Sequence, residues 1–78
     1  MANKRLKNII LEVVDNQIDS NDPPATRLTF ERLLGMGYTR KQAKEKIGSV
    51  VVTEIYDIMK NAESFDEARY IEELNKLR

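Results

Sequence analysis

The sequence predicts an all-α domain, a small irregular bundle of about four helices over residues 4–18, 23–34, 40–60 and 65–77. Apolar residues recur every three or four positions along these segments, and no segment alternates with the period of two typical of strands. Proline, glycine and helix-capping residues separate the segments. A chain of 78 residues has room for one domain, so we expect residues 1–78 to form a single helical unit.

The first helix is predicted from a broad apolar stripe. Its members are Leu6, Ile9, Ile10, Val13, Val14 and Ile18. The stripe stops at the polar and proline-containing stretch 19–24. Within this stretch, Asp22 is expected to cap the second helix, with Pro23 at the first helical position, where proline is tolerated.

The second helix is short and directs Phe30, Leu33 and Leu34 toward the interior. Two glycines follow it closely. Gly35 and Gly37 are expected to adopt the left-handed backbone conformation that commonly ends a helix.

Capping boxes are predicted for the last two helices. Thr39 and Gln42 have the spacing of such a box at the start of the third helix, and Ser64 and Glu67 have it at the start of the fourth. The third helix continues through Ala43, Ile47, Val50, Val51, Ile55, Ile58 and Met59. The apolar side of the fourth consists of Ala68, Tyr70, Ile71, Leu74 and Leu77.

The overall charge argues against an electrostatically driven partner. Thirteen Lys and Arg residues balance thirteen Asp and Glu residues, so no long-range field attracts nucleic acid or anionic lipid. The longest apolar runs, such as Val50-Val51-Val52, are far too short for a membrane span, and no signal-peptide core follows the basic start. With no cysteine present, the chain is expected to be cytoplasmic.

Catalytic chemistry has few candidate residues. The chain contains no His, no Cys and no glycine-rich phosphate loop. Acid pairs occur at helical spacing (Glu12 with Asp15, Asp15 with Asp19, Glu54 with Asp57). They make a carboxylate metal site a third functional interpretation, besides an interaction module and nucleic-acid binding. Di-metal bundles usually add histidines, however, so solvated helix faces explain these pairs better. We therefore expect no enzyme, no catalytic or metal-binding residue and no cofactor.

Two polar residues fall inside apolar stripes. At 100° per residue, Gln17 and Glu54 both lie on the sides of their helices that should face the interior. A buried carboxylate must be paired or protonated. We expect a buried polar network in which Glu54 is satisfied by the Gln17 amide, by Arg27 or Arg32 of the second helix, or by protonation, with arginine favoured for its two-pronged geometry.

A second functional interpretation is nucleic-acid binding. The second helix, the glycine turn and the third helix loosely resemble a helix-turn-helix, in which residues at the start of the second helix of the motif contact bases. The candidate contacts are Arg40, Lys41, Lys44 and Lys46. Cations at such positions also commonly just solvate the surface, which makes nucleic acid the alternative rather than the preferred partner.

One local motif resembles a known domain. Residues 34–38, Leu-Gly-Met-Gly-Tyr, followed by Ala43, resemble the Met-Gly-Phe/Tyr loop of ubiquitin-associated domains, which implies contact with ubiquitin. The resemblance is confined to this stretch. That family would need a short second helix and a prompt third, whereas here the helix after the loop continues through Val52 to Met59, and two glycines between helices need no ligand.

A wider resemblance rests on the order of weak motifs along the chain. They are Asp15-Asn16-Gln17-Ile18, Asn21-Asp22-Pro23-Pro24, Leu33-Leu34 with Gly37, Arg40, Ala43, Ile47-Gly48, Glu54-Ile55-Tyr56 and Phe65-Asp66 with Tyr70 and Leu74. This order resembles an uncharacterised family of small bacterial helical proteins, a domain of unknown function. Relatives often carry His at the positions of Leu11 and Glu45. The resemblance implies the fold and a bacterial origin, and no activity.

The stripes of the two long helices are wider than one packing side requires. Val52 and Met59 extend the stripe of the third helix, and Leu11 extends that of the first. Such surplus apolar surface commonly forms a two-fold interface. The sequence thus predicts a non-enzymatic interaction or structural module with a protein partner, and a homodimer.

Overall fold

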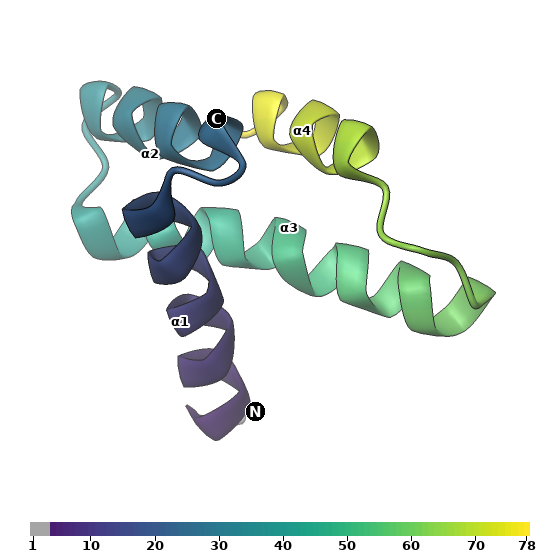
Figure 1. Ribbon diagram of the computed structural model, residues 1–78. Helices are drawn as coiled ribbons and strands as arrows, with labels where there is room; N and C mark the ends of the chain where they lie inside the picture. The colour runs from purple at the N-terminus through teal and green to yellow at the C-terminus, as the bar shows by residue number, and fades with distance from the viewer. Residues whose placement is uncertain (1–3) are drawn as a thin grey trace.

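The computed structural model describes residues 4–78, which form four helices (Figure 1). They are α1 (Lys4–Ser20), α2 (Pro24–Gly35), α3 (Arg40–Asn61) and α4 (Glu67–Asn75). The described part of the chain contains no strand. The all-α prediction is confirmed, and the helix bounds differ from the predicted ones by no more than two residues.

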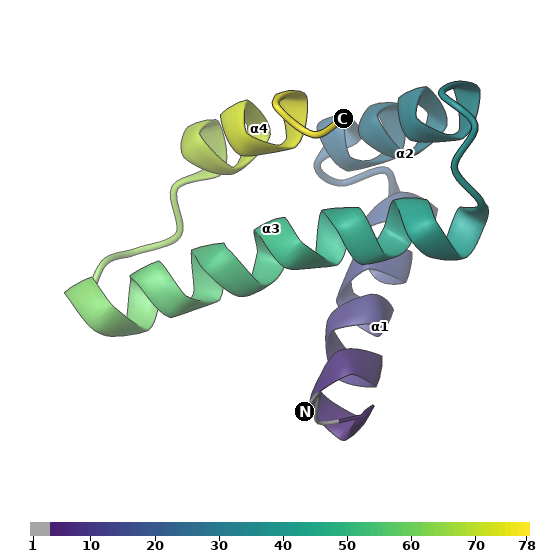
Figure 2. The same ribbon diagram turned by 180° about the vertical axis from the view of Figure 1, so that it is seen from behind.

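The helices are arranged around α3, the longest of them. Figures 1 and 2 show α2 and α4 along the same side of α3, while α1 crosses α3 and its N-terminal half extends away on the other side. Both α2 and α3 pack against each of the other three helices. The two long helices therefore pack together, and α2 and α4 share one layer on α3.

The core lies where α1, α2 and α4 meet on the first half of α3. Its buried apolar residues are Ile10, Val14, Ile18, Phe30, Leu33, Ala43, Ile47, Val50, Val51, Tyr70 and Leu74. Burial of this apolar surface is the main favourable contribution to folding. None of the described helices is both long and apolar enough to span a membrane.

Gly48 lets α1 approach α3 closely. A Cβ atom at this position would lie 3.2 Å from Cγ2 of Ile10 and 4.0 Å from Cδ2 of Leu11. The first distance is tighter than ordinary van der Waals contact between carbon atoms. The crossing point of the two long helices is therefore fixed at a residue without a side chain.

The starts of α3 and α4 are capped by different chemistry. The box at α3 is confirmed, because Thr39 Oγ1 accepts from the Gln42 amide at 3.1 Å and Gln42 Oε1 accepts from the Thr39 amide at 3.0 Å. The predicted cap at Ser64 is wrong. Asp66 caps α4 instead, its Oδ1 accepting from the Arg69 amide at 3.1 Å. A carboxylate there also interacts favourably with the positive end of the helix dipole.

The predicted start of α2 is shifted by one residue. Asp22 is not its cap, because the helix begins at Pro24 and the preceding Pro23 has extended backbone angles (φ −73°, ψ 151°). A residue before proline is disfavoured in the helical region, which keeps Pro23 outside the helix. At the other end, only one glycine is left-handed: Gly37 has φ 102°, whereas Gly35 is the last residue of α2.

Candidate functional site

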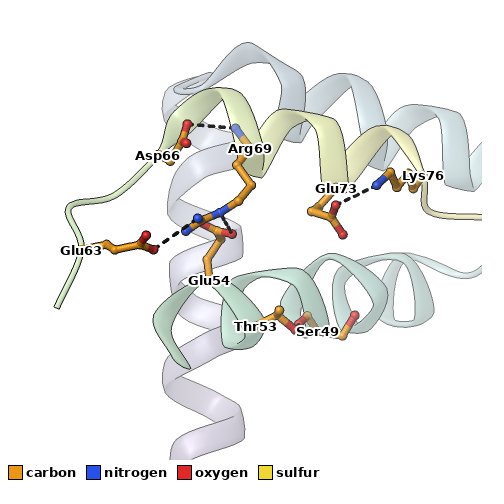
Figure 3. Close-up of polar contacts among 8 residues, drawn as sticks. All are labelled: Ser49, Thr53, Glu54, Glu63, Asp66, Arg69, Glu73 and Lys76. Carbon is orange, nitrogen blue, oxygen red and sulfur yellow. Dashed lines mark hydrogen bonds and ion pairs between the residues drawn. The ribbon is translucent and has the colours of Figure 1, made fainter. Parts of the chain in front are cut away.

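Glu54 of α3 is buried, with 3% of its surface exposed, and it pairs with Arg69 of α4 (Figure 3). Arg69 Nε donates to Oε2 at 3.0 Å, and Nη2 donates to Oε1 at 3.2 Å. This is the two-pronged geometry that makes arginine–carboxylate pairs strong and specific. The structure thus satisfies the carboxylate by an arginine of α4, not by one of α2, and the pair attaches α4 to α3.

Arg69 also forms hydrogen bonds with the segment that leads into α4. Its Nη1 donates to Glu63 Oε1 at 3.3 Å, and its backbone amide bonds the capping Asp66 (Figure 3). The pKa of Arg69 is raised above its usual value, chiefly because the guanidinium donates to Glu54. Sequence reasoning missed this residue. The available signal was that Arg69 directly precedes Tyr70, which lies on the apolar side of the last helix.

Gln17 is half-buried and forms a separate contact between three helices. Its Oε1 accepts from the hydroxyl of Tyr70 at 2.8 Å and from Oγ1 of Thr26 at 2.8 Å. Tyr70 is 1% exposed. Burial raises the pKa of Tyr70, although its hydrogen bonds to Thr26 and Gln17 act in the opposite direction. The amide of α1 therefore ties α2 and α4 together but does not reach Glu54.

Arg32 binds backbone carbonyls at the C-terminal end of α4. Its Nη1 donates to the carbonyl of Leu77 at 2.7 Å, and its Nη2 donates to the carbonyl of Leu74 at 3.0 Å. A cation is favourable at this point, because the last carbonyls of a helix lack partners and carry partial negative charge. Of the four residues expected in one network, Glu54, Gln17 and Arg32 therefore lie in three separate contacts, each of which joins helices, and Arg27 is exposed.

Ser49 lines two hollows of the surface. The first has a volume of ≈ 350 Å³ and lies beside Tyr38 and the first turns of α3. The second lies between α3 and α4 and adjoins the buried ion pair. This second hollow has a volume of ≈ 270 Å³ and is lined by Ser49, Val50, Thr53, Glu54, Glu73, Lys76 and Leu77. Lys76 and Glu73 pair with each other at 3.0 Å (Figure 3). The hydroxyls of Ser49 and Thr53 bond backbone carbonyls of α3. The polar groups at this hollow thus already bond within the chain.

Two cations at the start of α3 lie over an aromatic ring. Arg40 Cζ lies 5.5 Å and Lys44 Nζ 5.8 Å from the centre of the Phe30 ring. Lys44 Nζ also lies 2.6 Å from Oδ1 of Asp15 on α1. These distances are those of cation–π contacts and of an ion pair. Both side chains therefore help to pack α3 against α1 and α2.

The other two cations of this group differ from each other. Lys46 Nζ lies 4.7 Å from the centre of the Tyr38 ring, so this ammonium group also contacts its own chain. Lys41 is exposed on the first turn of α3. The group predicted as a nucleic-acid contact is thus largely engaged within the molecule.

The last part of α3, residues 52–61, is named the α3 arm. Its large exposed hydrophobic residues are Val52, Ile55, Tyr56 and Met59. Met59 is the most exposed of them, at 78%. Val52, Ile55 and Met59 follow Gly48 at helical spacing and so continue the side of α3 that meets α1. They lie beyond the crossing, where α1 no longer covers them.

The beginning of α1, residues 4–9, is named the α1 arm. Leu6 and Ile9 are exposed there at 53% and 54%. Leu6 lies one helical turn before Ile10, which packs on Gly48, so the arm continues the packing side of α1 past the crossing. Figures 1 and 2 show the two arms leaving the crossing in different directions.

Comparison with known proteins gives no further guide to the site. No protein family, no curated protein and no solved structure matches the chain. The resemblances to ubiquitin-associated domains and to a family of small bacterial helical proteins therefore stay predictions. Among residues 4–78, no three acidic side chains are grouped so that they could hold a metal ion.

Proposed function

We propose that this chain is a non-enzymatic interaction module that binds a protein partner through the α3 arm. The observation that carries the proposal is the row of Val52, Ile55, Tyr56 and Met59, which the four helices leave uncovered. Contiguous exposed apolar surface on a small protein marks an interaction site more often than chance exposure does.

The polar contacts that hold the helices together and the exposed apolar residues are different parts of the molecule, which supports this proposal. The polar contacts of Glu54, Gln17 and Arg32 each join two or more helices, so they maintain the fold. The α3 arm contributes its large apolar side chains to none of these contacts. An aromatic residue and a methionine, here Tyr56 and Met59, are also residue types enriched in protein interfaces.

Nucleic-acid binding through the start of α3 has weaker support, because three of its four cations contact rings or an acid of the same chain. A mobility-shift assay over a range of salt concentrations separates the two functions. Binding through phosphate contacts weakens steeply as salt increases, whereas binding through an apolar surface does not.

Photo-crosslinking in the cells that produce the chain tests the proposal. A benzophenone amino acid is placed at Tyr56 on the α3 arm and, as a matched control, at Glu31, which is exposed on α2. We expect protein adducts at position 56 that are absent at position 31. Equal adducts at both positions, or none at position 56, would contradict a protein-binding role for this surface.

A further inference from the structure

α4 is held differently from the other three helices. α1, α2 and α3 pack pairwise against one another, whereas α4 packs on α2 and α3. To the buried apolar core α4 contributes Tyr70 and Leu74, and the other core residues belong to α1, α2 and α3. These three helices, residues 4–61, are named the α1–α3 body. The body therefore keeps its mutual packing and most of its buried apolar residues without α4.

The segment that joins α3 to α4, residues 62–66, contacts α4. Glu63 Oε1 accepts a hydrogen bond from Arg69 Nη1 at 3.3 Å, and the centre of the Phe65 ring lies 5.7 Å from that of the Tyr70 ring. All residues of the segment are exposed, and Figure 1 shows it as an extended connection. The segment can therefore move together with α4 while these contacts stay intact.

The α1–α3 body binds α4 in one direction. Glu54 of α3 holds the first turn of α4 through its ion pair, and Arg32 of α2 binds the backbone carbonyls at the C-terminal end. An acid at the start of a helix and a cation at its end both match the direction of the helix dipole. Between them, Gln17 of α1 accepts a hydrogen bond from the Tyr70 hydroxyl. Glu54, Gln17 and Arg32 together are named the α4 slot.

We propose that α4 is a latch that leaves the α4 slot as one unit while the α1–α3 body stays folded. A helix of nine residues is too short to be stable on its own in water, so α4 is helical only while it is docked. Release uncovers an acid, an amide and a guanidinium that are arranged to bind a helix. The latch thus controls access to a surface distinct from the α3 arm, and this inference does not depend on the proposed function.

Native-state hydrogen exchange of the full chain in low concentrations of urea is the test. Local opening of a unit requires less free energy than global unfolding does. The amides of residues 70–75 should therefore have protection factors at least about tenfold lower than those of residues 47–51 in α3. Because release exposes a single helix, the protection of residues 70–75 should also depend less on urea than that of residues 47–51.

Two matched variants test whether the α1–α3 body stays folded during release. Thr39 caps α3 within the body, so its cap persists when α4 leaves. Thr39→Ala should lower the protection of residues 47–51 about fivefold and leave that of residues 70–75 unchanged. Arg69→Ala removes the ion pair with Glu54 and should lower the protection of both sets, because global unfolding also requires release of α4.

Three results would overturn the latch. The first is equal protection, with equal dependence on urea, of residues 70–75 and 47–51 in the wild type. The second is an equal loss in both sets on Thr39→Ala, since α4 would then open only with the whole chain. The third is unchanged protection of residues 70–75 in Arg69→Ala. Far-ultraviolet circular dichroism confirms that each variant is folded, and the wild-type comparison still decides if a variant is not.

Discussion

The two halves of α3 have a similar apolar periodicity but different surroundings. In the first half, Ala43, Ile47, Val50 and Val51 are buried beneath the other helices. In the second half, Glu54 is the only residue that is buried, and its apolar neighbours Val52, Ile55 and Met59 are exposed. Both halves have apolar residues at helical spacing. The periodicity of a helix thus shows which side is apolar, and the neighbouring elements decide whether that side is core or binding surface.

The largest difference between the halves should appear when isoleucine is truncated. Ile47 is fully buried, so Ile47→Ala should lower the free energy of unfolding by about 3 kcal/mol through lost burial and a residual cavity. Ile55→Ala, on the exposed arm, should cost less than about 1 kcal/mol at concentrations at which the chain is monomeric. Urea denaturation measures both. Equal losses would mean that the second half of α3 belongs to the core.

Glu54 marks the boundary between the halves, and its loss should have the next largest effect. Glu54→Ala should cost about 2 kcal/mol, because it removes a buried partner of Arg69 while the partly exposed guanidinium can still reach water. Glu54→Gln keeps an acceptor oxygen and should be milder. Asp57→Asn, one turn further along, should stay within about 0.5 kcal/mol. If Glu54→Ala were no more costly than Asp57→Asn in urea denaturation, the pair would not hold α4 on α3.

Loss of the helix cap should lower the stability of the chain more at the start of α3 than at the start of α4. Thr39→Ala removes a complete capping box and should cost about 1 kcal/mol. Asp66→Ala should cost less, because a short terminal helix frays more readily. Ser64→Ala is the matched control, since Ser64 is exposed and does not cap α4. Thermal denaturation that ranked Ser64→Ala above Asp66→Ala would place the start of α4 elsewhere.

The smallest effect is expected from the buried tyrosine, and only at high pH. Burial raises the pKa of Tyr70 in the folded chain, so the folded state keeps the phenolic proton to a higher pH than the unfolded state does. This contribution to stability is complete below the unfolded pKa of about 10 and is lost as pH rises through the folded pKa.

Urea midpoints at about pH 9 and about pH 11 bracket this transition. Tyr70→Phe should reduce the loss of stability between the two pH values, whereas Tyr56→Phe, which removes an exposed phenol, should not. The same alkaline loss in wild type and in Tyr70→Phe would show that the buried phenol does not contribute to it.

Local chemistry predicted the helices and most of their ends. The box at Thr39 was readable because both of its hydrogen bonds join residues three apart. The errors at Asp22 and Ser64 came from competing signals nearby. A second proline displaced the first from the helix, and a carboxylate two residues after Ser64 took the capping role. These competitions involve single residues, so a pattern places such a helix end only to within a residue or two.

Long-range contacts were only partly predictable. A carboxylate inside an apolar stripe correctly indicated that Glu54 is buried, because an unpaired charge there would be costly. The stripe holds no information on which helix supplies the partner. Arg69 reaches Glu54 because α4 returns along α3 on the side that α2 also covers (Figure 1), and this topology is set by the packing of all four helices. The exposure of the arms depends on the same topology.

Hydrogen–deuterium exchange measured at two protein concentrations tests most directly whether α3 is divided into a structural half and a binding half. When the concentration rises from low to high micromolar, amide exchange should slow in residues 52–61 and 4–9. It should stay the same in residues 40–51, which are already covered within one chain. Exchange that does not depend on concentration in either arm would contradict self-association of the chain, and exchange that slows equally along the whole of α3 would contradict this division.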